Sequence, residues 1–281
     1  MGGRAKQWGT AGLVVVTILG WPSASLSQST LSVRVQKWLQ VQEISGTVTI
    51  STPRGTRPAK IGDRLQAVGD SITTGQRSRA KLLVDTAIGT IEVAENTKLQ
   101  VQNLSAVTDQ GRITRLAIPY GRARLKLRKF TSPNSRLEIQ TPAGINGVRG
   151  TEFGLAIQPS GKTGLAVLEG TVSSEAQSQE VSVPGGFQSF TVPGDAPAPV
   201  VPLREDTNLN YQLQKLVNRG IRRIKLVGQV DPVNFVTVNG TPLDTDPTGQ
   251  FAVFFPAPSH LKIQVVVTTP LGTEKRYDIA L

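Results

Sequence analysis

Short alternations of apolar and polar residues fill the chain from Val41 to Val192, and glycine, proline, aspartate and asparagine interrupt them at short intervals. Alternation with a period of two is typical of half-buried β-strands, and the interrupting residues are typical of turns. Because no part of this stretch has a convincing helical period, we predict an all-β region of the sandwich, barrel or β-solenoid kind. The predicted strands include 47–50, 81–84, 90–93, 98–101, 115–118, 122–128, 137–139, 153–157 and 165–168.

A different period follows between residues 209 and 224. Apolar positions recur there at i, i+4, i+7 and i+8, which places them on one face of a helix. Asp206 or Thr207 provides a cap, and Gly220 ends the segment. We predict one helix over residues 205–220, with a basic cluster that compensates its dipole and solvates its surface. The apolar face consists of Leu209, Leu213, Leu216, Val217, Ile221 and Ile224, and the cluster of Arg219, Arg222, Arg223 and Lys225.

Proline marks a domain boundary before this helix. Residues 193–202 include four prolines, which remove backbone donors and hold the chain extended. After the helix the sequence returns to β alternation, with Asn239-Gly240 as a strong hairpin signal. Because this last unit is small, we expect its core to be completed by packing against the helix. The predicted organisation is a β domain at 44–192, a Pro-rich linker at 193–204, the helix at 205–220 and a β module at 221–281.

The N-terminus has the pattern of a secretory signal peptide. Arg4 and Lys6 precede an apolar stretch over residues 11–21, and Pro22 and a run of small residues follow. The apolar stretch is shorter than the roughly 20 residues that a spanning helix needs. We predict a signal peptide over residues 1–27, cleaved after Ser27 or Ser25, and a periplasmic or extracellular location. Membrane contact is expected only through an uncleaved signal segment.

The composition restricts the chemistry. Cysteine is absent and His260 is the one histidine, so disulfides, cysteine-based metal sites and multi-histidine sites are excluded. A half calcium loop at 244–249 has Phe255 where the bidentate glutamate belongs. A phosphate-loop ending at 161–163 has Ala156 where the first glycine belongs. We interpret both segments as turns and His260 as a loop residue, and we expect no metal, no cofactor and no enzymatic activity.

Asp63 and Asp70 share the context Gly-Asp, seven residues apart. Two such carboxylates perform acid–base chemistry in some hydrolases when they face each other across a cleft. Aspartate after glycine more often accepts hydrogen bonds from its own turn. We favour the turn interpretation, and a hydrolase is the alternative.

A basic stretch gives the strongest indication of binding. The chain carries a net charge of +11, and residues 122–128 alternate cations with small or apolar residues. In a strand, this alternation places Ala123, Leu125 and Leu127 inward and a row of cations outward. Such a row fits an anionic envelope glycan, lipid phosphates or an acidic partner protein, although a solvated sheet face is an equal interpretation. Nucleic acid is not expected for an exported chain. The candidate ligand-binding residues are Arg112, Arg115, Arg122, Arg124, Lys126, Arg128 and Lys129.

Three segments, residues 48–99, residues 141–153 and residues 167–172 followed by Gly185, together resemble the FecR-like domain family. The resemblance covers about residues 44–192, and its most specific stretch is Thr141-Pro142-x-Gly144-x-x-Gly147-Val148-Arg149-Gly150-Thr151-Glu152-Phe153. It implies an all-β, solenoid-like or roll-like domain that binds and signals without catalysis. The glycines are expected at sharp corners, and Arg149 and Glu152 are expected to bond the backbone or each other. The motif residues with a structural role are Gly62, Asp63, Gly69, Asp70, Thr141, Pro142, Gly147, Arg149, Gly150, Thr151, Glu152, Phe153, Glu169 and Gly170.

Two departures from the family pattern affect the expected function. Residues 85–88 replace the family's Asp-Gly-Ser turn, and the sequence shows a signal peptide where family regulators have a cytoplasmic segment and a spanning helix. The C-terminal β module resembles small Ig-like modules of bacterial envelope proteins. We therefore expect a non-catalytic exported protein that binds or scaffolds an envelope polysaccharide or protein. The alternative is a periplasmic component of a transmembrane signalling relay.

Overall fold

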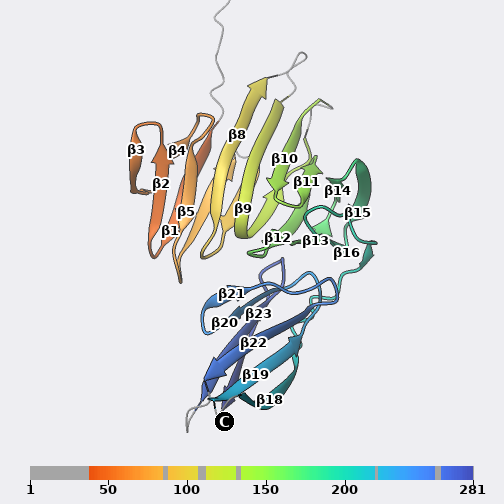
Figure 1. Cartoon of the computed structure of the whole chain (residues 1–281). Helices are drawn as coiled ribbons and strands as arrows, with labels where there is room; N and C mark the ends of the chain where they lie inside the picture. The colour runs from red at the N-terminus through yellow and green to blue at the C-terminus, as the bar shows by residue number, and fades with distance from the viewer. Residues whose placement is uncertain are drawn as a thin grey trace, which may run out of the picture. The chain divides into compact units, whose positions relative to one another are not determined.

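The computed structural model describes residues 38–84, 88–106, 112–130, 134–218, 221–256 and 261–280. The predicted signal peptide, residues 85–87 and His260 lie outside these ranges. The chain divides into two units, 1–35 and 36–281, and every described residue belongs to the second. All regular secondary structure in the described ranges is β-strand, which confirms the all-β prediction (Figure 1). Those ranges contain no helix that is long and apolar enough to cross a membrane.

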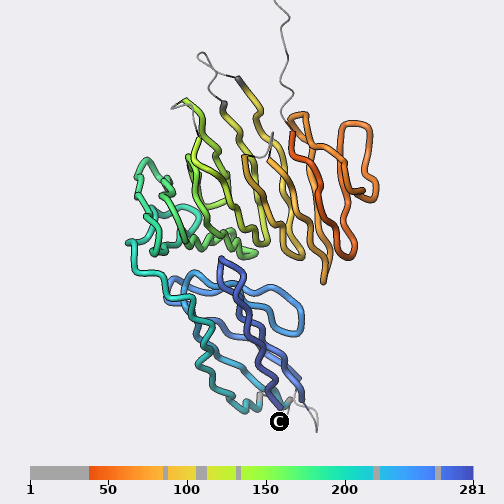
Figure 2. The backbone as a smooth tube through the Cα atoms, turned by 180° about the vertical axis from the view of Figure 1, so that it is seen from behind, coloured from red at the N-terminus to blue at the C-terminus, as the bar shows by residue number. Residues whose placement is uncertain are grey.

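The N-terminal β domain, residues 38–202, consists of two sheets, and the chain passes repeatedly from one to the other (Figure 2). Sheet A has the order β4 (Arg64–Leu65), β1 (Leu39–Ser45), β6 (Arg79–Val84), β7 (Gly89–Val93), β9 (Arg112–Leu127), β12 (Glu152–Ile157), β13 (Thr163–Glu169), β16 (Phe187–Thr191), β17 (Val201–Pro202). Sheet B has the order β3 (Gly55–Pro58), β2 (Val48–Thr52), β5 (Ser71–Thr74), β8 (Lys98–Ala106), β9, β10 (Arg136–Thr141), β11 (Gly144–Val148), β14 (Thr171–Ala176), β15 (Gln179–Pro184).

Strand β9 joins the two sheets. Its first half pairs with β8 and β10 in sheet B, and its second half pairs with β7 and β12 in sheet A. The change occurs at Pro119-Tyr120-Gly121. Gly121 has a φ of 98°, and a Cβ atom there would lie 2.2 Å from the Thr97 hydroxyl oxygen, so only glycine fits. Inward residues of both sheets, such as Leu82, Leu116 and Leu125, form one fully buried core.

The C-terminal β domain, residues 209–280, consists of two antiparallel sheets around a second core. Sheet C has the order β18 (Asn210–Asn218), β19 (Ile221–Gln229), β22 (Gln250–Pro256). Sheet D has the order β21 (Thr241–Leu243), β20 (Phe235–Val238), β23 (Lys262–Thr268), β24 (Glu274–Ala280). Asn239 and Gly240 have φ values of 51° and 79° between β20 and β21, so the predicted hairpin turn is confirmed. The Ig-like assignment rests on the sequence alone.

The predicted helix at 205–220 is wrong, because residues 210–218 form strand β18. A spacing of four residues is compatible with both a helix face and a strand face, so Leu209, Leu213 and Val217 fit either structure. Leu216 distinguishes the helix from the strand. It belongs to the predicted helical face, but in the strand it lies on the side opposite to Leu213, where it is 39% exposed. Pairing of all nine residues of β18 with β19, including Leu213 with Leu226, fixes the extended conformation.

The Pro-rich segment is part of the N-terminal β domain. Ala198 N–H donates to the carbonyl of Phe190, and Val201–Pro202 forms β17 against β16. The Ser189 hydroxyl donates to the carbonyl of Ala198 at 2.7 Å. The prolines therefore place an edge segment along β16, where missing N–H donors are tolerated, and residues 193–202 are not a free spacer.

The C-terminal β domain packs against a face of small residues on β12 and β13. A Cβ atom on Gly154 would lie 2.0 Å from the carbonyl oxygen of Pro270, and one on Gly164 would lie 2.0 Å from that of Val233. The buried Gln158 amide donates to the carbonyl of Asn234 at 3.0 Å and accepts from the N–H of Thr245 at 2.8 Å. Backbone packing and buried amide bonds thus hold the two domains together.

Candidate functional site

Two adjacent cavities lie where the end of sheet A meets the C-terminal β domain. The first has a volume of about 750 Å³ and is closed by the loop at residues 269–272 and by Glu274. Charged side chains line it, including Arg77, Arg79, Arg122 and Glu95. The second has a volume of about 660 Å³ and is closed by the hairpin of β20 and β21. Aromatic, proline and amide side chains line it: Tyr120, Phe235, Pro159, Pro242, Gln76, Asn96 and Asn239.

Three segments of the N-terminal β domain contribute consecutive residues to the two cavities. Gln76 lines the second cavity and Arg77 the first, Asn96 lines the second and Glu95 the first, and Gly121 precedes Arg122 in the same way. We call the two cavities together the interdomain groove. Its halves differ in chemistry. One is aromatic and amide-rich, and the other, the guanidinium-rich half, carries four arginines and Lys81 together with Glu43, Glu92, Glu95 and Glu274.

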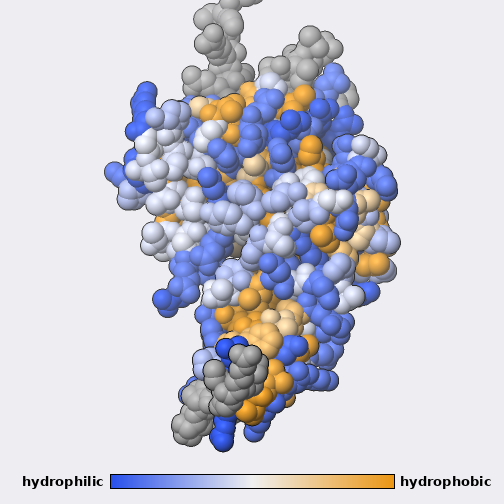
Figure 3. All heavy atoms as spheres, viewed as in Figure 1, coloured by the Kyte–Doolittle hydropathy of each residue, from blue (hydrophilic) through white to orange (hydrophobic). Residues whose placement is uncertain are grey.

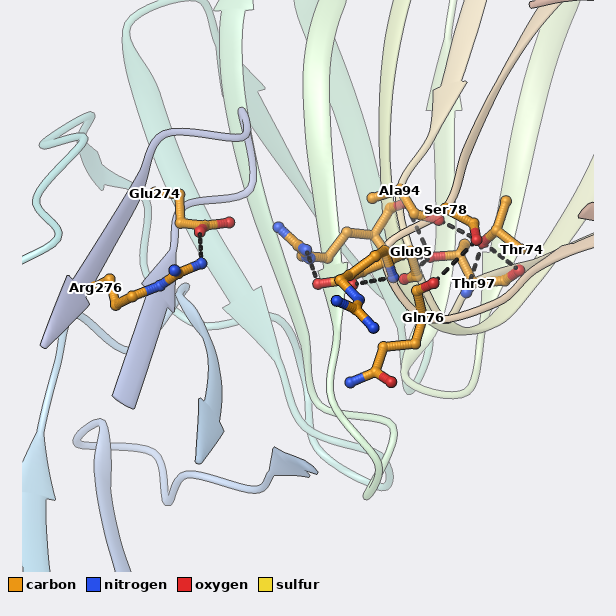
Figure 4. Close-up of polar contacts among 10 residues, drawn as sticks. Thr74, Gln76, Ser78, Ala94, Glu95, Thr97, Glu274 and Arg276 are labelled. Atoms are coloured by element: carbon orange, nitrogen blue, oxygen red, sulfur yellow. Dashed lines mark hydrogen bonds and ion pairs between the residues drawn. The ribbon is translucent and has the colours of Figure 1, made fainter. Parts of the chain in front are cut away.

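Hydrogen bonds fix the two turns that supply these residues. The Thr74 hydroxyl donates to the carbonyls of Ala94 and Thr97 and accepts from the N–H of Thr97, which joins the end of β5 to the turn after β7 (Figure 4). The Ser78 hydroxyl donates to the carbonyl of Gln76 at 3.0 Å. The Glu95 carboxylate accepts from the N–H of Arg77, a residue held at a φ of 52°. The Gln76 side chain points away from this network (Figure 4).

Arg122 lies between the two halves of the groove. Its guanidinium lies 3.7 Å from Glu95 and 5.3 Å from the centre of the Phe235 ring. Burial lowers the pKa of the guanidinium, while Glu95 and Glu274 raise it. An arginine in such a place keeps its charge. Its Nε atom is buried without a hydrogen-bond partner among the described residues.

Arg77 and Arg79 are the groove cations with free guanidinium groups. Both side chains are exposed, and neither forms an ion pair with a described residue. Glu274 in the same cavity lies 3.9 Å from Arg276, which is drawn beside it in Figure 4. The two arginines are therefore available to an anionic group that enters the groove.

The basic strand has the predicted facing but carries ion pairs along its length. Ala123, Leu125 and Leu127 are buried, as the alternation predicted. Register places the outward cations beside acidic residues of other strands, because Glu92 faces Arg124 across β7 and β9. Of the candidate residues, Arg122 and Arg124 line the groove, Arg115 pairs with Glu138 at 2.6 Å, and Arg128 and Lys129 are exposed. The Arg112 side chain lies outside the described residues.

Glu152 neutralises two cations of the basic strand. Its carboxylate accepts from Arg124 at 2.5 Å and pairs with Lys126 at 2.9 Å. Burial acts to raise the pKa of Glu152, but the hydrogen bonds from Lys126 and Arg124 outweigh it and lower the pKa. The expected partner, Arg149, is instead exposed, and its carbonyl accepts from the N–H of Phe130. Glu152 therefore has a structural role, but with different partners.

Most of the other motif residues form turn hydrogen bonds, have positive φ values or are buried. Asp63 accepts from the N–H of Lys60, and Asp70 accepts from the N–H groups of Gln66 and Ala67, so the turn interpretation is confirmed for both. Thr141 donates to the carbonyl of Gly144. Gly62, Gly69, Gly150 and Gly170 have positive φ values, Gly147 lies in β11, Thr151 and Phe153 are buried, and Pro142 and Glu169 are exposed.

Sequence reasoning missed the groove residues Arg77, Arg79, Tyr120 and Phe235. The Arg-Ser-Arg spacing after Gln76 and the isolated Tyr120 before a glycine were visible signals, but nothing local connects them with Phe235. Within the described ranges, no group of three or more His, Asp or Glu side chains is arranged to hold a metal ion.

Comparison with models of known protein families gives a match within the N-terminal β domain. Residues 70–173 match the family model described as FecR protein. The chain therefore contains a FecR domain, as the sequence motifs indicated. No curated protein matches the chain.

Solved structures overlap with the chain in part. A protein of Parabacteroides distasonis described as a putative anti-sigma factor, with crystal structures at 1.65 and 2.50 Å resolution, has 13% identity and a TM-score of 0.38. That overlap covers 50% of this chain and 66% of the other. A polysaccharide lyase has 8% identity and a TM-score of 0.19, over 86% of this chain and 39% of the other. Neither overlap bears on the function of this chain.

Proposed function

We propose that the protein is a non-catalytic component of the cell envelope, located in the periplasm or outside the cell, that binds a carboxylate-bearing glycan in the interdomain groove. The observation that carries the proposal is the placement of consecutive residues in the two halves of the groove, an aromatic and amide-rich half and a guanidinium-rich half. Pockets with a few placed polar groups on an apolar lining are the usual binding sites of small molecules and short polymer segments.

The aromatic half suits the body of a sugar unit. Tyr120 is 43% exposed, so its ring is available to a flat apolar face of a ligand. The amides of Gln76 and Asn96 line the same cavity and make no side-chain hydrogen bond with the described residues, so both can donate and accept. Hydroxyl groups of a saccharide need such paired donors and acceptors.

The guanidinium-rich half suits a carboxylate. Arginine presents parallel N–H donors that match the two oxygens of a carboxylate, and charge-assisted hydrogen bonds are stronger than neutral ones. Arg77 and Arg79 are free for this purpose, whereas Arg122 is held by Glu95 and Phe235. A ligand with an acidic group next to a sugar ring would occupy both halves.

Catalysis is not part of the proposal. The carboxylates of Asp63 and Asp70, which are the candidates for acid–base chemistry, accept hydrogen bonds from their own turns. Of the four glutamates that line the groove, Glu95 bonds the N–H of Arg77 and pairs with Arg122, Glu43 pairs with Lys81, and Glu274 pairs with Arg276.

Co-sedimentation of the purified protein with cell-wall sacculi tests the proposal. We expect the protein to pellet at low salt and to be released at high salt, because exposed charge pairs are screened. Tyr120→Ala should weaken binding about fivefold, and Tyr211→Ala is a matched control, since Tyr211 is 44% exposed and lies outside the groove. The proposal is wrong if the wild-type protein stays in the supernatant at low salt, or if both tyrosine variants bind like the wild type.

A signalling component of the FecR type is the second candidate, and the FecR domain match favours it. Ile61 and Val68, each directly before a Gly-Asp pair, are 70% and 63% exposed. Exposed apolar side chains of this kind are common at protein contacts. A photo-crosslinker at Ile61 or Val68 in intact cells should then capture an envelope protein, while one at the exposed Arg54 should not. Equal labelling at all three positions would remove the support for this candidate.

A further inference from the structure

Two segments of the C-terminal β domain have an unusual charge distribution. Residues 207–230 and 247–273 contain no aspartate or glutamate. They supply strands β18, β19, β22 and β23, and therefore all of sheet C. The cations of these strands in the described ranges are Lys215, Arg222, Arg223, Lys225 and Lys262.

Register sorts the side chains of sheet C onto two faces. Leu226 and Phe251 are on the inner face and belong to the second core, and Ile224 on the same face is buried. The same pairing arranges the outer-face side chains in four rows, each of which crosses the three strands. The rows are Asn210, Gln229 and Gln250; Gln212, Val227 and Ala252; Gln214, Lys225 and Phe254; and Leu216, Arg223 and Pro256.

The outer face of sheet C changes in character along the strands. It begins with amides beside the N-terminal β domain and ends with cations and apolar side chains at the hairpin of β18 and β19. Phe254 is 55% exposed and Leu216 is 39% exposed. Figure 3 shows hydrophobic residues gathered on the visible face of the C-terminal β domain.

A cation–π contact lies at the centre of this face. The ammonium of Lys225 is 5.7 Å from the centre of the Phe254 ring. The side chain of Lys225 is half-buried, so its stem covers apolar surface and its charge remains at the surface. A surface that joins exposed apolar side chains to cations, with no carboxylate among its described residues, is complementary to phosphate groups above an apolar layer.

We propose that the outer face of sheet C docks on the surface of a bilayer that contains anionic phospholipid. Arg223 and Lys225 would contact the lipid phosphates, and Phe254 and Leu216 would enter the boundary between headgroups and acyl chains. A second copy of the chain fits less well, because two such faces would bring like charges together. A glycan fits less well, because the exposed side chains of Leu216 and Phe254 offer it no hydrogen bond.

Vesicle co-sedimentation of the whole protein tests this docking. We expect binding to vesicles of phosphatidylcholine and phosphatidylglycerol (about 3:1) and at least tenfold weaker binding to pure phosphatidylcholine, since each basic residue near an anionic surface adds attraction. Arg223→Glu with Lys225→Glu should weaken binding to the anionic vesicles at least 30-fold. Phe254→Ser should weaken it about fivefold and should leave a remainder that is more sensitive to salt.

Matched controls separate this face from net charge and from the groove. Arg54→Glu with Lys60→Glu changes the net charge equally at exposed positions of the N-terminal β domain, and we expect its vesicle binding to fall less than threefold. Arg223, Phe254, Arg54 and Lys60 are exposed and Lys225 is half-buried, and an unchanged thermal transition shows that each variant is folded.

Three results would overturn the docking proposal. The first is equal binding to neutral and anionic vesicles. The second is an equal loss in the Arg223/Lys225 and Arg54/Lys60 variants. The third is binding to sacculi that depends on Arg223 and Lys225 without any binding to vesicles, which would assign the face to a glycan. None of these results depends on Tyr120, so failure of the docking proposal is distinct from failure of the groove.

Discussion

The outer faces of sheet A and sheet C use similar cations in opposite ways. On sheet A, cross-strand neighbours form a ladder of alternating charge, Glu43, Lys81, Glu92 and Arg124, over four adjacent strands. On sheet C, the corresponding face has Arg223 and Lys225 beside Phe254 and Leu216, without a carboxylate among its described residues. Sheet A neutralises its own charge, whereas the cations on the outer face of sheet C have no carboxylate beside them among the described residues.

Strand register therefore decides whether a cation is available for binding, because it sets which side chains lie beside that cation. The basic strand β9 has the densest run of cations in its domain. Glu152 alone forms ion pairs with two of them, Arg124 and Lys126. Sheet C has fewer cations but none of them has an acidic neighbour on the same face. A count of charges along the sequence therefore points to β9, and the pairing of strands points to the groove and to sheet C.

The largest expected effect comes from separating the two domains. In Gly164→Val, the new side chain would occupy the place of the Val233 carbonyl, whose oxygen lies 2.0 Å from the Cβ position. We expect a loss of about 3 kcal/mol or more in the free energy of unfolding, since neither backbone can yield easily. Denaturant unfolding measures it. Gly147→Ala is the control, because its nearest atom is 3.6 Å away, and an equal loss there would contradict the close approach.

A second substitution converts the neutralised face into a charged one. Glu152→Gln keeps the shape of a buried side chain but removes the negative charge shared by Arg124 and Lys126. We expect the variant to lose about 1–3 kcal/mol of stability and to bind heparin, used as a soluble polyanion, more tightly than the wild type. Unchanged heparin affinity in a folded variant would show that the two cations are already available.

The boundary between the domains should also respond to pH. The Lys162 ammonium is buried, donates to the Thr245 hydroxyl at 3.0 Å and to the Asp246 carbonyl, and lies 4.8 Å from the Phe190 ring centre. Burial lowers its pKa to about 8, against raising contributions from Asp246 and Asp231. Between pH 8 and 10.5 the unfolded chain retains a proton that the folded chain has released, so this group makes the protein more stable as the pH rises.

Lys162→Met isolates this contribution. The difference in unfolding free energy between wild type and variant should shift in favour of the wild type by about 1 kcal/mol per pH unit above pH 8, and should be constant below it. Chemical denaturation at several pH values gives the difference. A constant difference from pH 7 to 10 would show that the amine titrates as in water.

The smallest expected effect lies at the end of the charge ladder. Glu43 and Lys81 are 3.5 Å apart, with side chains 69% and 33% exposed, and solvent-accessible pairs of this kind contribute little to stability. Glu43→Ala should change the free energy of unfolding by less than about 0.5 kcal/mol. A loss above about 1 kcal/mol would mean that the ladder acts as a cooperative network.

Local features of the fold were predictable from the sequence. The inward facing of Ala123, Leu125 and Leu127 follows from period-two alternation, and the turns at Asp63, Asp70 and Asn239 follow from their own side chains and neighbours. The strand at 210–218 did not follow, because its apolar spacing of four fits both periods. Only pairing with β19, which is a tertiary fact, decides between them.

The candidate site was less accessible to sequence reasoning. The interdomain groove joins the turn at Gln76 and Arg77 with Phe235 and the loop at 269–272, which are far apart in the chain. Neutralisation of Arg115 by Glu138 likewise depends on the parallel pairing of β9 with β10. Long-range pairing of this kind leaves no local signal, although the FecR motif itself was recognisable.

Sacculus affinity of two charge-matched variants tests the central claim, that position in the interdomain groove and not free positive charge determines binding. Arg77→Ser with Arg79→Ser and Arg128→Ser with Lys129→Ser each remove two exposed cations without an ion-pair partner among the described residues, and only the first pair lines the groove. We predict that the dissociation constant for sacculi rises at least tenfold in the first variant and less than twofold in the second. Equal weakening in both variants, or weakening in the second alone, would contradict the claim.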